Sequence, residues 1–187
     1  MLLLNHRLQV VAETDPRRKG TCMDFVLDPP RGVAPVRLGM TFDEAVAAVS
    51  EWGEPRVVGP RLHSPLVTVS FKVDEVAFQI HLEEEDRVTA IELWWPGEGR
   101  QSSTRVLLDG EDVFTTPARQ ILEHAVARGW AVEDALTENP VIPGVSLGFA
   151  RQTSQEMPRD IDGRLMYFTS VLVGGERYFD FRAELRT

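Results

Sequence analysis

The chain has 187 residues, of which 43% are hydrophobic and 26% charged, and its formal net charge is −9. This length fits one domain or two small ones, and the hydrophobic fraction is typical of a globular protein. The acidic charge, with a sequence pI of about 5.0, argues against non-specific nucleic-acid binding, which needs a basic face. The single cysteine, Cys22, excludes an internal disulfide framework and a thiolate zinc site.

The start of the chain predicts an N-terminal arm or extension over residues 1–22, with the globular pattern beginning near Met23. His6 and Arg7 interrupt the apolar beginning, and no basic region precedes it, as a secretory peptide would require. No stretch reaches the roughly 18 apolar residues of a membrane span. We therefore expect a cytoplasmic protein that binds neither nucleic acid nor a membrane.

The first helix is expected to begin after Thr41. Thr41 and Glu44 have the spacing of a capping box, and an apolar stripe with helical spacing follows. The stripe consists of Phe42, Ala45, Val46 and Val49. Gly53 supplies the left-handed conformation that ends a helix, and Pro55 prevents its continuation.

Three runs with strict alternation of apolar and polar residues predict strands at 67–73, 76–82 and 89–95. A four-residue loop at 84–87 joins the last two as a hairpin. The resulting register pairs Phe78 with Leu93, Ile80 with Ile91, Val76 with Trp95, Gln79 with Glu92, and Ala77 with Trp94. Pattern and register agree, which favours this pairing.

The second half predicts the same order. Thr116 is the expected cap of a helix with Pro117 in its first position, and Gly129 is the expected stop. Strand-like runs follow at 130–132 and 145–149. A second hairpin is expected from 165–173 through Gly174-Gly175 to 176–182. Its register pairs Phe168 with Phe181, Ser170 with Phe179, Thr169 with Asp180, and Tyr167 with Arg182.

Together these patterns predict an α+β fold of two similar halves, each with a helix followed by antiparallel strands and with the helices packed on one face of the sheet. The first unit covers residues 23–105 and the second covers 106–187, either as separate units or as one continuous domain.

The first helix entry resembles a known family signature. The residues Val36 to Val46, closing with Gly53-Glu54-Pro55, are similar to the Leu-Gly-Met-Thr helix entry of β-lactamase inhibitor proteins and the BamE/SmpA family. That resemblance covers about 20 residues. It implies a helix-plus-sheet repeat that tends to bind proteins, and it transfers no functional residue. The second half departs from the signature at 114–117, and the chain lacks the paired cysteines usual in those exported families.

One mixed aromatic and polar surface is the candidate binding interface. Adjacent tryptophans on a strand point to opposite faces, so Trp95 belongs to the core while Trp94 shares the polar face. An exposed tryptophan among polar residues is typical of an interface anchor, unless the arm or the other half covers it. The candidate residues are Trp94, Glu92, Gln79, His81, Tyr167, Tyr178 and Arg182.

No catalytic group, metal site or cofactor is expected. His81 lies near Glu92 in the expected register, as a general base with a carboxylate partner would. A solvated histidine on a strand is the favoured interpretation. The Gly-x-Ser-x-Gly run at 144–148 precedes no helix, so it is not a nucleophile elbow. Residues 160–163 lack the remaining ligands of a calcium loop and predict an Asp-Gly turn. The acidic run at 83–86 is expected to be a solvated loop.

The leading hypothesis is a non-enzymatic protein-binding module of inhibitor, immunity or adaptor type, whose partner is a basic protein or a second copy of the chain. The alternative is a small ligand-binding protein or enzyme with a cavity between sheet and helices, which requires a pocket of about 300 Å³ or more.

Overall fold

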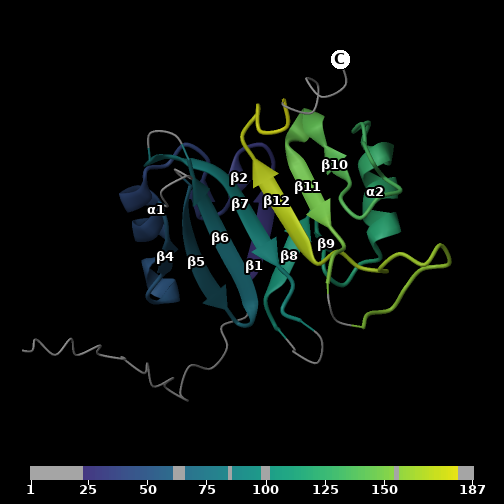
Figure 1. The fold of residues 1–187 in the computed structure, drawn as a ribbon, viewed down its shortest axis with the longest axis horizontal. Coiled ribbons are helices and arrows are strands. Elements are labelled where there is room, and N and C mark those ends of the chain that lie inside the picture. Colours follow the sequence, from purple (N-terminus) through teal and green to yellow (C-terminus); the bar gives the residue numbers. More distant parts are fainter. Residues whose placement is uncertain (1–22, 61–65, 84–85, 98–101, 154–155, 181–187) are drawn as a thin grey trace, which may run out of the picture.

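The computed structural model describes residues 23–60, 66–83, 86–97, 102–153 and 156–180. Within these ranges the chain forms two α-helices and two β-sheets, an α+β fold (Figure 1). The expected N-terminal arm, with Cys22, lies outside the described residues.

The larger sheet has seven antiparallel strands in the order β10-β11-β12-β7-β6-β5-β4. The strands are β4 (Arg56–Val58), β5 (Val67–Val73), β6 (Val76–Leu82), β7 (Val88–Trp94), β10 (Val141–Ile142), β11 (Leu147–Ala150) and β12 (Ser170–Gly174). Four of the five predicted β6–β7 pairs are confirmed, including Phe78 opposite Leu93 and Gln79 opposite Glu92. The fifth is not formed as a ladder pair, because β7 ends at Trp94, before Trp95. A register shift between His81 and Leu82 precedes the loop.

The smaller sheet joins the two halves of the chain. Its order is β3-β2-β1-β8-β9, and β1 and β8 are parallel. The strands are β1 (Asp24–Asp28), β2 (Gly32–Val33), β3 (Val36–Arg37), β8 (Arg105–Leu108) and β9 (Glu111–Asp112). The expected boundary between residues 105 and 106 falls inside β8. Because β8 pairs with β1 and β12 pairs with β7, both sheets contain strands from both halves.

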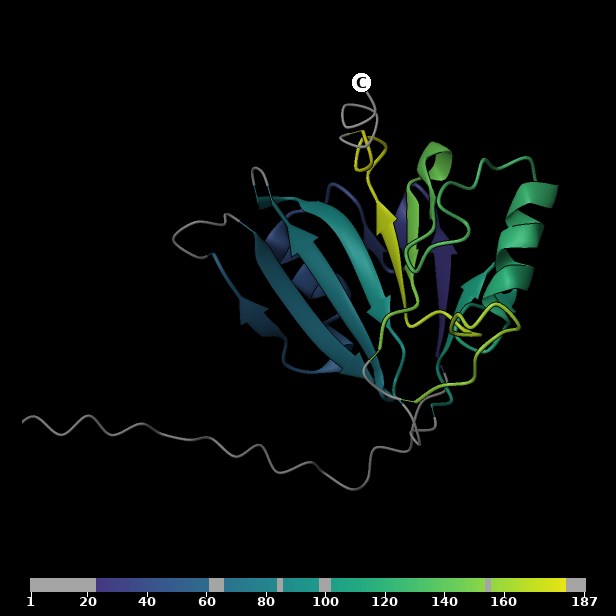
Figure 2. The same cartoon turned by 45° about the vertical axis from the view of Figure 1, so that its right-hand side comes forward.

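The core lies between the two sheets. In Figures 1 and 2 the purple strands β1 and β2 lie behind the larger sheet, whose inner face is entirely apolar along β6. Trp52 packs edge-on against Phe25 and Phe78, with ring centroids 5.3 and 5.0 Å apart. Both phenylalanines are fully buried. The opposite face of the larger sheet faces the viewer in Figure 1.

The first helix is confirmed. In α1 (Phe42–Ala48) the Thr41 hydroxyl accepts a hydrogen bond from the Glu44 backbone N–H, and the Glu44 carboxylate accepts one from the Thr41 N–H. The helix ends earlier than expected, and a 3₁₀ turn at Ser50–Trp52 fills the space before Gly53, whose φ is 103°. Ala45 and Val49 of the predicted apolar stripe are buried in the core, and Phe42 and Val46 pack against it.

The second helix, α2 (Ala118–Ala127), differs from the prediction at its start. Pro117 is the N-cap, so the expected capping by Thr116 is wrong. The end is as predicted, since Gly129 has a φ of 83° and closes a Schellman motif. In that motif the Gly129 N–H donates to Val126 and the Trp130 N–H donates to Ala125. In both views α1 and α2 lie at opposite ends of the molecule (Figures 1 and 2).

The expected second hairpin is wrong. β12 ends at Gly174, and residues 176–180 form turns instead of a return strand. Ser170 therefore lies opposite Trp94 and Ala150 rather than Phe179, and Thr169 has no strand partner in Asp180. The reason is packing, because the rings of Tyr178 and Phe179 fold back onto Gly174 and Gly148, which have no side chains. The other two expected pairs include Phe181 and Arg182, which lie outside the described residues.

Two strand runs in the second half also differ. Residues 130–132 form no strand, and the chain makes only an isolated bridge between Glu133 and Val141. The run expected at 145–149 is a 3₁₀ turn at Pro143–Val145 followed by β11, which extends to Ala150.

Candidate functional site

The outer face of the larger sheet carries most of the predicted interface residues. The register places Gln79 beside Glu92 and Ala77 beside Trp94 on this face, with His81 beside Ala90. Strands β5 and β12 extend the face on either side. It comprises Arg56, Val58, Thr68, Ser70, Lys72, Ala77, Gln79, His81, Ala90, Glu92, Trp94, Ser170 and Leu172. No described helix or strand lies in front of this face in Figure 1.

Trp94 is the large aromatic group of this outer face. Its residue surface is 37% exposed, whereas the neighbouring Trp95 is partly buried against the core. The two residues beside it across the sheet, Ala77 and Ser170, are small. The indole therefore meets small neighbours on both sides, and its exposed part is available to a partner, as at a binding anchor.

His81 and Glu92 form a polar cluster with Thr68 at the centre of the face. The His81 Nε2 atom lies 3.6 Å from Glu92 Oε2, and Nδ1 lies 3.4 Å from Thr68 Oγ1. The side chains of His81 and Glu92 are only 15% and 18% exposed. Thr68 lies on β5, which pairs with β4 and β6 on its two sides, so its backbone groups belong to sheet ladders. The cluster lies next to the register shift between His81 and Leu82.

Tyr178 borders the outer face at the β12 end. Its ring lies against Gly174 and meets Phe179 edge-on, with centroids 5.2 Å apart. Burial raises the pKa of the Tyr178 phenol, and the charges of Glu83 and Glu92 act in the same direction. Tyr178 therefore lies near both carboxylates at this corner of the face.

One predicted interface residue, Tyr167, does not lie on a strand of this face. The hairpin that would place Tyr167 there does not form, and Tyr167 precedes β12 in a segment held by the Ala118 N–H, which donates to Met166 O. Arg182 lies outside the described residues.

The motifs considered for catalysis have structural roles. Ser146 is buried, has a left-handed conformation, and donates from Oγ to Gly175 O at 2.6 Å. A strand rather than a helix follows it, so the Gly-x-Ser-x-Gly run is no elbow. Asp160 forms the expected turn by accepting hydrogen bonds from the Asp162 and Arg164 N–H groups. His124 pairs with Glu111 at 2.7 Å on the exposed side of α2.

A groove beside α2 was missed by the sequence analysis. It has a volume of about 490 Å³ and contains Arg151, Arg164 and Asp160 in its lining. Residues 151–162 form a polar, loop-like run, and nothing in that pattern distinguishes a buried arginine from a solvated one. The long run of polar residues after β11 is the only sequence signal that indicates a groove wall without regular secondary structure.

Two general searches cover the described residues. Among them, no three His, Cys, Asp or Glu side chains gather as metal ligands would. None of the described helices combines the length and apolar character needed to cross a bilayer.

Comparisons with known proteins include a distant structural likeness. No protein-family model matches the chain, and no curated protein matches it. A solved cysteine-rich secretory protein from Staphylococcus aureus is similar at a TM-score of 0.43 and 10% identity, over 84% of this chain and 51% of that one. The chain thus spans about half the length of that protein.

Proposed function

We propose that the chain is a non-enzymatic protein-binding module, of inhibitor, immunity or adaptor type, that docks a basic protein on the outer face of its larger sheet and acts in the cytoplasm. The observation that carries the proposal is the exposed indole of Trp94 on a face with no described layer in front of it. Tryptophan is among the residues that contribute most to binding energy at interfaces.

Charge supports the choice of partner. The chain has a formal net charge of −9, while the outer face carries both signs, with Glu92 near its centre and Lys72 and Arg56 toward β5 and β4. The net charge of the whole chain attracts a basic protein during diffusional encounter and repels an acidic one. The association rate should therefore fall as ionic strength rises.

The polar cluster also supports binding. His81, Glu92 and Thr68 lie beside the register shift between His81 and Leu82, with side-chain contacts of 3.4 and 3.6 Å. These three side chains offer hydrogen-bonding partners to a docked protein.

The helix entry gives weaker support. The capping box at Thr41 resembles that of the β-lactamase inhibitor proteins and the BamE/SmpA family, which implies a protein-binding tendency. We also propose that the two halves derive from one helix-plus-strands unit, with α1 preceding β4–β7 and α2 preceding β10–β12.

The test compares two faces of the same sheet. A photo-crosslinking amino acid, benzoyl-phenylalanine, is placed at Ala77 on the outer face or at Val57 as the control. Val57 is 46% exposed but pairs with the inward-facing Val69, so it lies on the opposite face. Crosslinking is performed in lysate of the producing cells. The captured protein is identified, purified and titrated against the wild-type chain and Trp94→Ala.

The proposal predicts a basic protein captured from position 77 and not from 57, with binding weakened at least about tenfold by Trp94→Ala. Equal binding to both chains, or capture only of a second copy of this chain, would overturn it. A self-association would also appear as a concentration-dependent mass in light scattering.

A further inference from the structure

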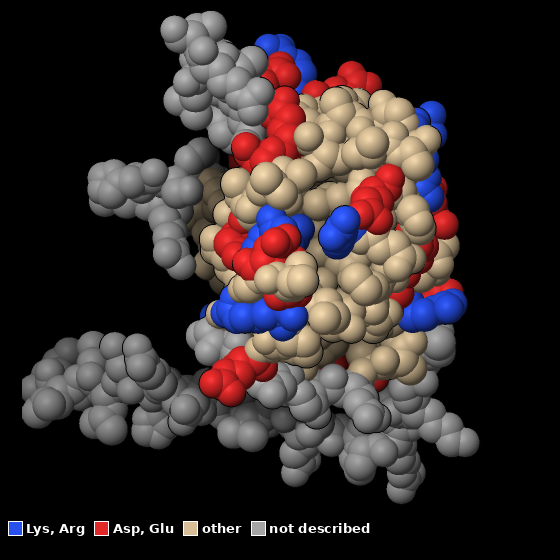
Figure 3. Space-filling view, turned by 90° about the vertical axis from the view of Figure 1, so that its right-hand side faces the viewer, with Lys and Arg blue, Asp and Glu red and all other residues tan. Residues whose placement is uncertain are grey.

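A groove of about 490 Å³ lies on the side of the molecule away from α1. Its apolar wall includes Leu122 and Val126 from α2, together with Val132 and Leu136 from the following segment. Figure 3 faces this side and shows charged side chains of both signs gathered on an otherwise uncharged surface. This volume lies in the range of small-molecule sites, which combine apolar walls with a few polar groups.

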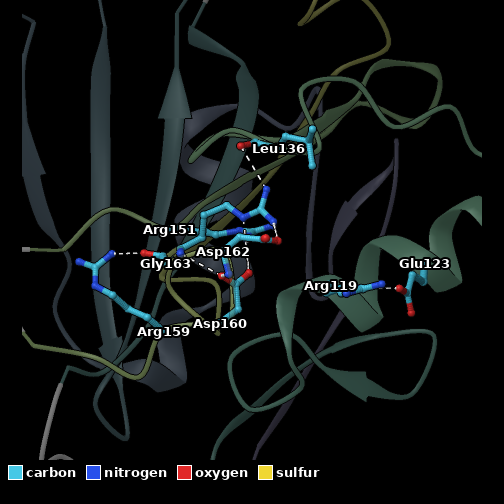
Figure 4. Close-up of polar contacts among 9 residues, drawn as sticks. Arg119, Glu123, Leu136, Arg151, Arg159, Asp160, Asp162 and Gly163 are labelled. Carbon is cyan, nitrogen blue, oxygen red and sulfur yellow. Dashed lines mark hydrogen bonds and ion pairs between the residues drawn. The ribbon is translucent and has the colours of Figure 1, made fainter.

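Two of the three arginines in the groove already have carboxylate partners. Arg119 Nε donates to Glu123 Oε1 at 2.7 Å, and both residues lie on α2. Arg164 bonds to Asp160 and Asp162, and its Nη1 reaches Leu136 O at 3.4 Å. Figure 4 labels the Arg119–Glu123 pair on α2, and Asp160, Asp162 and Leu136 near Arg151. The charges of Arg119 and Arg164 are neutralised within the protein.

Arg151 is different. It lines the groove, it is only 3% exposed, and its Nε has no hydrogen-bond acceptor among the described residues. The nearest carboxylate oxygen, Asp160 Oδ2, lies 4.0 Å from Nη1, which is beyond hydrogen-bond distance. Asp160 is itself occupied by two backbone N–H groups and Arg164. The guanidinium therefore has no short ion pair with a carboxylate among the described residues. Its central carbon lies 5.2 Å from the centroid of the Phe168 ring.

Electrostatics agree with this geometry. Burial lowers the pKa of Arg151, and the nearby charge of Arg164 acts in the same direction, while Asp160 and Glu138 oppose both. A buried cation without strong hydrogen bonds is costly. An anion at the floor of the groove would compensate it, since guanidinium groups bind carboxylate and phosphate oxygens with charge-assisted hydrogen bonds.

We propose that this groove binds a small amphipathic organic anion, with its carboxylate or phosphate head against Arg151 and its apolar body against Leu122, Val126 and Val132. The site is separate from the outer face of the larger sheet, because none of the residues lining the groove belongs to that face. Both head groups satisfy the same guanidinium chemistry, so the experiment decides between them.

The test uses three probes with the same apolar chain: octanoate, octyl phosphate and octanol. Binding to the full chain is measured by calorimetry or by NMR shift perturbation. At least one anion is expected to bind, and to bind more tightly than octanol. If both anions bind, they should compete with each other. The anion that binds more tightly identifies the head group. Arg151→Met should weaken anion binding about tenfold or more and remove the preference over octanol.

A second variant protects the test against misfolding of Arg151→Met. Val126 is 59% exposed in the apolar wall, so Val126→Glu leaves the core intact while adding a negative charge to the site. It should also weaken anion binding about tenfold, whereas Val57→Glu on β4 should not. The proposal is overturned if no probe binds saturably up to about 10 mM, if octanol binds as well as the anions, or if Val126→Glu has no effect.

Discussion

His81 and Glu92 lie on neighbouring strands as a diagonal pair, with the imidazole Nε2 3.6 Å from the carboxylate Oε2. Their direct cross-strand partners are Ala90 and Gln79, respectively. Small and uncharged partners leave room for the two side chains to lean toward each other across the sheet. This contact lies at the centre of the proposed docking face, and it follows from the register of β6 and β7.

The His81–Glu92 contact should produce a measurable coupling energy. A double-mutant cycle of His81→Gln and Glu92→Gln, measured by urea unfolding, is expected to give about 0.2–1 kcal/mol, as for other cross-strand pairs. Strictly additive effects of the two substitutions would show that the side chains do not interact in solution.

The capping box of α1 should contribute to stability. Thr41→Ala removes the hydroxyl that accepts from the Glu44 N–H, and we expect the free energy of unfolding to fall by about 1 kcal/mol. Thr41→Ser keeps the hydroxyl and is the matched control. Denaturant unfolding that finds Ala and Ser equally stable at this position would contradict the capping role.

The two adjacent glycines after β12 should respond differently to alanine. A Cβ at Gly174 would lie 2.5 Å from Tyr178 Cγ, whereas at Gly175 the nearest atom, Thr89 O, is 3.8 Å away. Gly174→Ala is expected to destabilise the fold by about 1–3 kcal/mol because the ring must move. Gly175→Ala should stay within about 0.5 kcal/mol of wild type. Thermal unfolding of the pair decides, and equal melting temperatures would refute this packing of Tyr178.

Asp74 should make stability depend on pH. Its carboxylate accepts hydrogen bonds from the Ser103 hydroxyl and N–H, both at 2.6 Å, and from the Thr104 N–H at 3.2 Å. These bonds, with the Ser103 hydroxyl contributing most, lower the pKa of Asp74 below its ordinary value of 3.8. The stabilisation is therefore fully present well above pH 3.8 and is lost as the pH falls through the lowered pKa of the folded state.

The measurement for Asp74 compares the unfolding free energies of wild type and Asp74→Asn across pH. The difference at pH 7 should be about 1 kcal/mol, since solvent screens this surface site, and it should shrink toward zero in acid. A difference that is independent of pH would show that the charge of Asp74 is not involved.

The sequence predicts those parts of the fold that are encoded locally. The β6–β7 register follows from strict alternation in two seven-residue strands joined by a short loop. The start of α1 follows from Thr41, and the end of α2 follows from Gly129. The interactions that fix these features join residues close to one another in the sequence, so the local residue pattern is enough to predict them.

The rest depends on contacts between distant residues. β12 carries alternating residues and is followed by Gly-Gly, which favours a local hairpin, but its valines pair with β7 instead. The parallel pairing of β1 with β8 joins residues 24–26 to 105–107, and no local pattern contains it. For the same reason the outer face with Trp94 was predicted from one hairpin, whereas the groove at Arg151 needed the complete fold.

The most direct test of the docking face is a calorimetric titration of the protein crosslinked from position 77 into wild type, Trp94→Ala and Val57→Ala. We predict that Trp94→Ala weakens binding at least about tenfold while Val57→Ala leaves the affinity unchanged. An affinity that is the same for wild type and Trp94→Ala would contradict a docking role for this face.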